Sequence, residues 1–386
     1  MHIQVAQKEL ETATRVVSGL IDRAASALPI TANILIETNE RGVQLRGSDS
    51  ESQVTVNLNA SVKKPGRTTV PGDTFGQIVS LLPPMSEVSV EEQNDRVTVT
   101  CDANEYKLMT SPADDFPDLA GDPGETRFQM TQKALKNMID AVVYALPTRD
   151  HRKVLLGVFM ELRDNKLRMT STDGKKLARI SVSLPEIEGH GTASLVVPRK
   201  LLENLSKNMS NEGPVEVELS ARQIVARFGN VIYRCNAIEG KYPDCDAVIP
   251  KDFPQMIPLN RDQFSQATRR AGVVSDDKNK SIILKFDNNG CKFTSTAHDV
   301  GSFNGKMSLD YSGPALEIAF NYQFLIDTLG HFDTPEVRMF VKNATAPVVF
   351  RGREDEDRIA LLMPIKLADA RPAPAGGRDG SDEEEA

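Results

Sequence analysis

The stretch MTSTDGKKLARI, residues 169–180, alternates polar and apolar side chains on either side of the pair Asp173–Gly174. Such alternation around a turn-forming pair predicts two antiparallel strands joined by a hairpin. Related stretches stand 124 positions away on either side: LRGSDSESQV, where Asp49 corresponds to Asp173 (173 − 49), and FTSTAHDVGSF, where Thr296 corresponds to Thr172 (296 − 172). The chain therefore repeats one hairpin three times.

The length of 386 residues exceeds one ordinary core and fits three units of common domain size. Each unit opens with a β-like segment and an amphipathic helix, in IQVAQKELETATRVVSGLI, FQMTQKALKNMIDAVVYAL and IPLNRDQFSQATRRAGVV. A second helix follows each hairpin, and Pro71 and Pro198 stand near two of these starts. The expected fold class is α+β, with three tandem pseudo-repeats of two helices and about eight antiparallel strands. The expected domains are 1–122, 123–252 and 253–367.

Composition indicates a soluble globular protein, with 40% hydrophobic and 26% charged residues. The start of the chain lacks the apolar core of a signal peptide, so we expect a cytoplasmic location and no membrane association. The four cysteines lie without a Cys-x-x-Cys pair or a nearby histidine, which favours reduced structural thiols and no metal site.

The net charge of −8 is unevenly distributed. From Asp369 onward six acids and two bases give −4, so residues 368–386 are expected to be a disordered acidic tail. Basic residues recur on the expected helices: Lys8, Arg15, Arg23, Lys133, Lys136, Arg199, Lys200, Lys207, Arg269 and Arg270. A further basic loop, PTRDHRKV, begins at Pro147. Charge alone favours ordinary solvated faces for these residues.

Edge strands at the two ends of a three-unit chain must pair or be covered, and ring closure is one solution. At the usual helix spacing, six helices from one chain would line a bore of roughly 16 to 19 Å, whereas twelve from two chains would line roughly 30 to 38 Å. Only the dimer would admit duplex DNA. It would contact phosphates without reading bases, through Arg23, Arg149, His151, Arg152, Lys153 and Lys200.

Over residues 1–367 the motifs TSTDGKKL, VVPRK, KYPDCDAVIP and LLMPIKL, in this order, resemble those of the bacterial DNA polymerase III β subunits, the sliding clamps. The resemblance implies a DNA-clamp fold and a head-to-tail homodimer around duplex DNA. It implies that the chain confers processivity by tethering the replicative polymerase α subunit, the clamp loader and other clamp-binding proteins. No catalysis, cofactor or metal is implied.

The resemblance also implies a partner-peptide pocket shared by the second and third domains. Its residues would be Leu155 from the VLLG strand, Thr172, Gly174, Lys175, Lys176, Leu177, Pro243, Ala247, Val248, Phe324, Leu361, Met363 and Pro364. Lys175 and Lys176 replace the His-Arg pair frequent in the family, and Ala247 replaces a frequent Arg, which alters the polar rim. At the dimer interface, Tyr106 would meet Val273 and Val274 of the other chain.

Two other classes of function are weighed. Enzyme signatures such as His-Glu-x-x-His, a P-loop or Gly-x-Ser-x-Gly are absent from the sequence, and the five histidines are scattered. A β-rich repeat scaffold without DNA encirclement would explain the repeats but not the basic helices.

Overall fold

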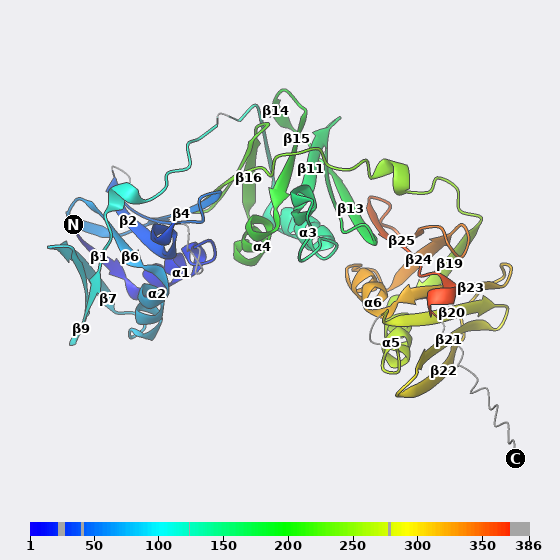
Figure 1. Cartoon of the computed structure of the whole chain (residues 1–386). Coiled ribbons are helices and arrows are strands. Elements are labelled where there is room, and N and C mark those ends of the chain that lie inside the picture. Colours follow the sequence, from blue (N-terminus) through cyan, green and yellow to red (C-terminus); the bar gives the residue numbers. More distant parts are fainter. Residues whose placement is uncertain (22–27, 40–41, 123, 277–278, 371–386) are drawn as a thin grey trace, which may run out of the picture. The chain divides into compact units, whose positions relative to one another are not determined.

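The computed structural model describes residues 1–21, 28–39, 42–122, 124–276 and 279–370. The chain divides into two compact units. Figure 1 labels the helices and strands in chain order. Unit 1 comprises Met1–Asp173 and Arg179–Pro243, and unit 2 comprises Gly174–Ala178 and the described residues from Asp244 onward. None of the helices in the described ranges is long and apolar enough to cross a membrane.

The first repeat contains two α-helices, a 3-10 turn near each end and nine strands. They are α1 (Gln7–Val17), α2 (Gly72–Leu81), η1 (Pro29–Ala32), η2 (Ala113–Asp115), β1 (His2–Ala6), β2 (Asn33–Asn39), β3 (Gly42–Ser48), β4 (Ser52–Leu58), β5 (Ser61–Lys64), β6 (Arg67–Pro71), β7 (Glu87–Gln93), β8 (Arg96–Cys101) and β9 (Asn104–Met109). One sheet has the order β5-β1-β7-β8-β9, which leaves β9 at its edge.

The second repeat follows the same element order. It contains α3 (Gln132–Val143), α4 (Arg199–Asn208), η3 (Lys153–Leu156), β10 (Thr126–Thr131), β11 (Gly157–Arg163), β12 (Lys166–Thr172), β13 (Lys176–Ser183), β14 (Ile187–Gly189), β15 (Ala193–Pro198), β16 (Pro214–Leu219), β17 (Gln223–Phe228) and β18 (Val231–Asn236). Nine strands of the two repeats form a sheet with the order β14-β10-β16-β17-β18-β4-β3-β2-β6.

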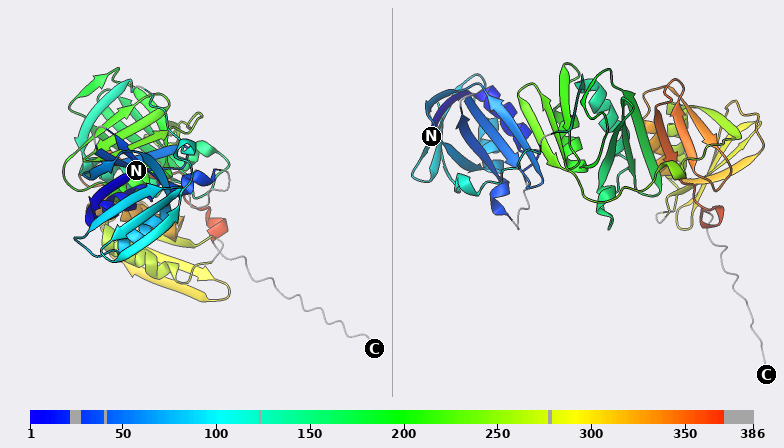
Figure 2. Two further views of the ribbon diagram at one scale, coloured as in Figure 1. Left: turned by 90° about the vertical axis from the view of Figure 1, so that its left-hand side faces the viewer. Right: turned by 90° about the horizontal axis from the view of Figure 1, so that it is seen from above.

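The pairing of β18 with β4 joins the first two repeats. Val231 lies opposite Val56, Tyr233 opposite Val54 and Cys235 opposite Ser52. The right-hand view of Figure 2 shows the blue strands of the first repeat continuing into the green strands of the second. Unit 1 therefore contains two repeats linked by main-chain hydrogen bonds.

The third repeat lies in unit 2. It contains η4 (Asp246–Val248), α5 (Arg261–Gly272), α6 (Tyr322–Gly330), α7 (Leu367–Ala370), β19 (Gln255–Asn260), β20 (Ser281–Asp287), β21 (Gly290–Ala297), β22 (Gly301–Met307), β23 (Leu316–Asn321), β24 (Glu336–Val341), β25 (Val348–Gly352) and β26 (Arg358–Leu362). Its strand orders are β22-β21-β20-β23 and β26-β25-β24-β19. Disorder from residue 368 was a wrong expectation for 368–370, which belong to α7, and 371–386 lie outside the described residues.

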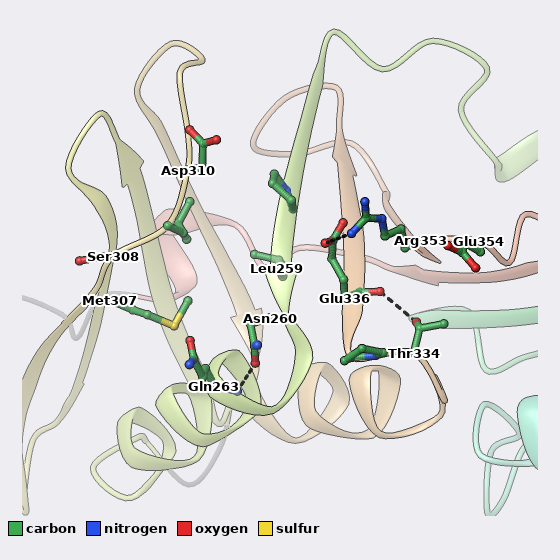
Figure 3. Close-up of a pocket in the computed structure, with 13 residues that line it drawn as sticks. Leu259, Asn260, Gln263, Met307, Ser308, Asp310, Thr334, Glu336, Arg353 and Glu354 are labelled. Atoms are coloured by element: carbon green, nitrogen blue, oxygen red, sulfur yellow. Dashed lines mark hydrogen bonds and ion pairs between the residues drawn. The ribbon is translucent and has the colours of Figure 1, made fainter.

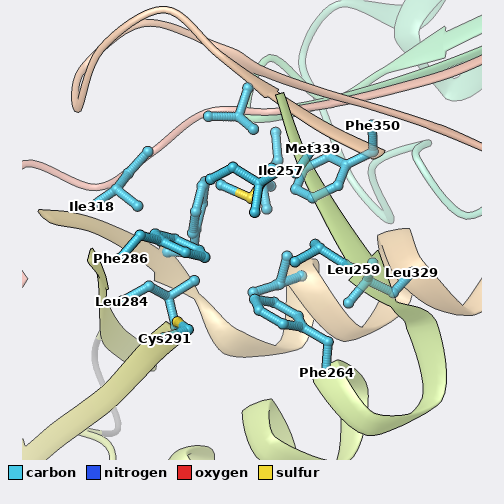
Figure 4. Packing of buried hydrophobic residues seen from close by; sticks show 14 of the residues in the cluster. Ile257, Leu259, Phe264, Leu284, Phe286, Cys291, Ile318, Leu329, Met339 and Phe350 are labelled. Atoms are coloured by element: carbon cyan, nitrogen blue, oxygen red, sulfur yellow. The ribbon is translucent and has the colours of Figure 1, made fainter. Parts of the chain in front are cut away.

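The core of unit 2 lies where its two sheets and two longer helices meet. Fully buried Ile257, Leu259 and Phe264 from β19 and α5 pack with Phe286 and Phe350 from the two sheets (Figure 4). Phe264 and Phe293 add a tilted ring contact with centroids 5.2 Å apart. The alternation of the strands and the apolar stripe of α5 thus bury one face each.

The three predicted hairpins are confirmed as β3–β4, β12–β13 and β21–β22. In the second, Gly174 takes a φ of +85°, a conformation that glycine adopts at low cost. In the first, the Asp49 carboxylate closes the turn by accepting hydrogen bonds from the Ser52 and Glu51 amides at 2.7 and 3.3 Å. We expected about eight strands in each repeat. The described residues contain nine in the first repeat, nine in the second and eight in the third.

All four cysteines are buried, and no disulfide joins them in the described residues. Burial raises the pKa of Cys235 to about 12, and the pKa of Cys291 is raised by the same cause. The thiols of Cys235 and Cys291 therefore stay protonated and unreactive at neutral pH, as structural thiols do.

A matched pair of glycine substitutions tests the packing of unit 1. A Cβ on Gly157, at the start of β11, would lie 2.6 Å from the main-chain oxygen of Val197, whereas one on Gly76, inside α2, meets nothing closer than 3.6 Å. We expect Gly157→Ala to destabilise the protein by about 1–3 kcal/mol through overpacking. Gly76→Ala should stabilise it by about 0.5–1 kcal/mol because it improves helix propensity. Thermal and denaturant unfolding measure both, and equal effects would contradict the described packing.

Candidate functional site

Two of the predicted docking residues of unit 2, Phe324 and Met363, contact the segment after the β12–β13 turn. The main-chain oxygen of Lys175 accepts a hydrogen bond of 2.8 Å from the Met363 amide, just after β26. The Lys176 ammonium lies 4.7 Å from the ring centroid of Phe324 on α6. The hairpin segment, the start of α6 and the end of β26 therefore meet within unit 2.

Exposure separates these residues into a surface and its support. Val248 and Met363 keep 49% and 39% of their areas exposed, which is high for large apolar side chains. Ala247 is also exposed, and Phe324 and Pro364 are half-buried. Leu177, in contrast, is 1% exposed, and Leu361 is also buried. We call the exposed and half-buried apolar residues predicted for docking in unit 2 the unit 2 docking surface: Ala247, Val248, Phe324, Met363 and Pro364.

The two lysines of the hairpin differ in role. Lys175 is exposed. Lys176 is only 8% exposed and holds its ammonium over Phe324, a cation–π contact. The charge of Lys176 is therefore directed at the Phe324 ring.

Three predicted pocket residues belong to unit 1. Thr172 is half-buried at the end of β12, and Pro243 is exposed after Tyr242, whose ring stacks on Phe159 with centroids 5.2 Å apart. Leu155 was expected on a strand, but it lies in η3, a 3-10 turn that precedes β11, and it is buried. The short apolar run VLLG does not distinguish a strand from a buried turn.

The basic loop after α3 is held at its base by Arg199. The Arg199 guanidinium donates to the main-chain oxygens of Leu146 and Pro147, at 2.8 and 3.3 Å. Within the loop, hydrogen bonds from the side chain and amide of Arg152 lower the pKa of Asp150 to about 2. The Arg152 charge is therefore paired, while Arg149, His151 and Lys153 remain exposed.

Lys200, predicted to face DNA, takes part in the junction between the first two repeats. Its ammonium donates to the Leu20 main-chain oxygen at 2.9 Å and to the Asp49 carboxylate at 2.8 Å. On the next turn of α4, the Asn204 amide donates to the Gly19 oxygen at 3.1 Å. These contacts cross 151 to 185 residues of sequence, so sequence periodicity could not reveal them. Arg23 lies outside the described residues.

The predicted dimer residues lie on separate units. Val273 and Val274 follow α5, and Val273 keeps 79% of its area exposed. Tyr106 is half-buried on β9, the edge strand of the five-stranded sheet. Sequence analysis missed that β22, which neighbours only β21, is also an edge strand. Its alternation resembled that of the paired strands, so only the sheet order distinguishes it.

Comparison with known proteins agrees with the three-repeat architecture. The chain matches the N-terminal domain of the DNA polymerase III beta subunit over residues 1–120, the central domain over 129–244 and the C-terminal domain over 246–366. Among curated relatives, the beta sliding clamp of Pseudomonas putida is 28% identical over 369 residues, 95% of this chain and 100% of the relative. That of Escherichia coli K12 is 28% identical over 342 residues, 88% and 93% of the two chains.

Solved structures agree as well. A sliding clamp from Pseudomonas aeruginosa bound to griselimycin superposes with a TM-score of 0.90 at 26% identity, covering 95% of this chain and 100% of that one. A sliding clamp from Bacillus subtilis gives 0.89 at 25% identity, covering 95% and 99%. Since the three domain matches follow one another along nearly the whole described chain, it belongs to the bacterial DNA polymerase III beta subunits, the DNA sliding clamps.

Proposed function

We propose that two copies of this chain close head to tail into a ring around duplex DNA, where they tether the replicative polymerase without catalysing a reaction. The observation that carries the ring is the β4–β18 junction of unit 1. It pairs the third strand after α1 with the last strand of the second repeat. The corresponding strands of the terminal repeats, β22 and β9, are both sheet edges. Each copy thus offers the two halves of one further junction.

The side chains near these edges fit such a junction. In unit 1 the residues after α1, Gly19 and Leu20, receive hydrogen bonds from α4. Val273 and Val274 hold the corresponding place after α5, and an exposed Val273 there suits an apolar contact. We propose that Tyr106 on β9 of the other copy covers these valines.

The DNA partner would be bound through its phosphates alone. Exposed basic residues occur on the helices of all three repeats: Lys8, Arg15, Lys133, Lys207, Arg269 and Arg270. The exposed loop residues Arg149, His151 and Lys153 add to this set. Contacts of this kind are independent of base sequence and weaken steeply with salt, as a sliding protein requires.

Partner proteins would dock on the unit 2 docking surface. Its exposed apolar members suit Leu or Phe anchors of a short peptide, and Met363 is a side chain that adapts to several partners. Lys175 favours an acidic flank in that peptide. We propose that the polymerase α subunit, the clamp loader and other clamp-binding proteins share this surface. The cytoplasm is the expected location, as for any protein that acts on chromosomal DNA in a bacterium.

Retention on circular DNA tests the ring. Protein loaded on circular DNA should be retained at moderate salt. It should dissociate once the DNA is linearised, because a ring slides off a free end. A Val273→Ala, Val274→Ala variant should shorten retention on the circle by weakening the interface. Gel filtration of DNA with labelled protein measures both. A β-rich scaffold without encirclement would leave circles and linear DNA at the same rate.

Charge reversal tests the basic loop. An Arg149→Glu, Lys153→Glu variant should lose retention at moderate salt, and each lost phosphate contact should lower the slope of log affinity against log salt by about one unit. The matched control is Arg163→Glu, which reverses an exposed charge at the end of β11. Equal salt slopes for the loop variant and the wild type would show that Arg149 and Lys153 do not contact DNA phosphates.

Exposed substitutions test the docking surface without disturbing the core. A Val248→Asp, Met363→Asp variant should bind a labelled polymerase peptide with Leu and Phe anchors at least tenfold more weakly, since burying one apolar side chain contributes about 1.5–3 kcal/mol. Leu177 is unsuitable because it is buried. Met85→Asp, at a highly exposed residue of unit 1, is the control. Unchanged peptide affinity in the double variant would move docking to another surface.

A further inference from the structure

β19 has an open edge that its counterparts in the other repeats lack. In the first repeat, β1 pairs with β7 on one side and with the short β5 on the other. In the second, β10 pairs with β16 and with the short β14. β19 pairs with β24, and the segment 308–314, which would supply the covering strand, takes no strand conformation. The third repeat therefore leaves open an edge that the chain closes twice with its own residues.

The alternation of the ladder shows what this edge offers. The Arg261 amide donates to the Pro335 oxygen at 2.9 Å, which continues the β19–β24 register in which Leu259 faces Val337. Hydrogen-bonded pairs alternate in antiparallel sheets, so Met256 and Pro258 direct their main-chain groups away from β24. Pro258 has no N–H to leave unpaired there. Met256 retains both a donor and an acceptor.

A cavity of about 580 Å³ lies beside the end of this strand (Figure 3). The segment from Met307 to Asp310 borders it on one side, and Glu336, Arg353 and Glu354 border it on the other. Its three acids and one base sum to −2. Arg353 pairs with Glu336 at 3.2 Å, so Asp310 and Glu354 are the acids left to attract a cation. Nearby Met256, 48% exposed, supplies apolar contact area.

We propose that the open edge of β19 binds an extended basic segment of a partner protein as an added antiparallel strand, attracted by the negative charges of Asp310 and Glu354. The first repeat supplies the template, because Ser61, Val62 and Lys64 of β5 lie opposite Gln4, Ile3 and His2 of β1. In the repeat alignment Ile3 corresponds to Ile257, so Met256–Pro258 would receive a similar strand. The last eight residues of this chain, DGSDEEEA, carry the opposite charge and are unsuited to the site.

This site is separate from the unit 2 docking surface, so the proposed clamp function does not depend on it. The probe is a fluorescein-labelled peptide Ala-Ser-Val-Lys-Lys-Pro-Gly, the sequence of residues 60–66. A version with Glu for both Lys tests charge, and one with Pro for Val tests strand addition at constant charge. In anisotropy titrations of the full chain, the Lys peptide should bind and each altered peptide should bind at least tenfold more weakly.

Variants of the protein test the same site from the other side. Asp310→Asn with Glu354→Gln should weaken binding of the Lys peptide at least fivefold. Met256→Pro should weaken it at least tenfold, because it removes the outward N–H but leaves the β24 ladder intact. Met256→Ala keeps that N–H and should stay within about threefold of wild type. Thermal unfolding of each variant checks that the fold is retained, and the altered peptides make the same test on wild-type protein.

Four results would overturn the proposal. The first is equal binding of the Lys and Glu peptides, and the second is equal binding of the Val and Pro peptides. The third is loss of peptide binding in the Met363→Asp variant, which would assign the peptide to the unit 2 docking surface. The fourth is binding more than tenfold tighter to a chain ending at Ala370, which would make the chain's own last residues the occupant.

Discussion

The main-chain hydrogen bonds between β4 and β18 are the interaction on which unit 1 depends. They merge strands of two repeats into one nine-stranded sheet, and so set where α1 meets α4. The ion pair between Lys200 and Asp49 then lies over this junction, with its charges partly sheltered from solvent. Because each main-chain hydrogen bond contributes about 1 kcal/mol regardless of side chain, such a junction can be built with quite different sequences. This explains how the fold persists at 26% to 28% identity to its relatives.

Strand edges also explain the division of labour among the repeats. In the first repeat, β4 pairs with β18 of the second repeat, whereas β9 is a sheet edge. In the third repeat, β22 and β19 are sheet edges. Repeats of the same architecture thus differ chiefly in which edges are covered. Edges left open in a soluble protein invite pairing with another chain unless they are managed. Two features of this chain limit such pairing: Pro258 on β19, and the lysines on β5, which is short and exposed.

Local sequence was enough to predict the repeats, hairpins and helix faces. The Asp-Gly turn after Thr172, the prolines at 71 and 198 and the alternating runs each specify structure within a few residues. Val248 and Met363, which were named through motifs that resemble a family, are exposed apolar residues in the structure. What local patterns could not show were partners far along the chain. The ring under Lys176, the carboxylate beside Lys200 and the buried 3-10 turn at Leu155 all depend on the packing of distant segments.

The closure of one repeat on another by strand edges has a mechanical consequence. A force applied at one end of two paired strands, perpendicular to them, breaks their hydrogen bonds one pair after another. A packed apolar interface, in contrast, must separate over its whole area at once. An edge junction of five residue pairs, like that of β4 with β18, can therefore resist thermal opening and still peel apart under a modest, directed pull at one end. A ring closed in this way would be durable to diffusion yet open to a machine that grips a single strand terminus.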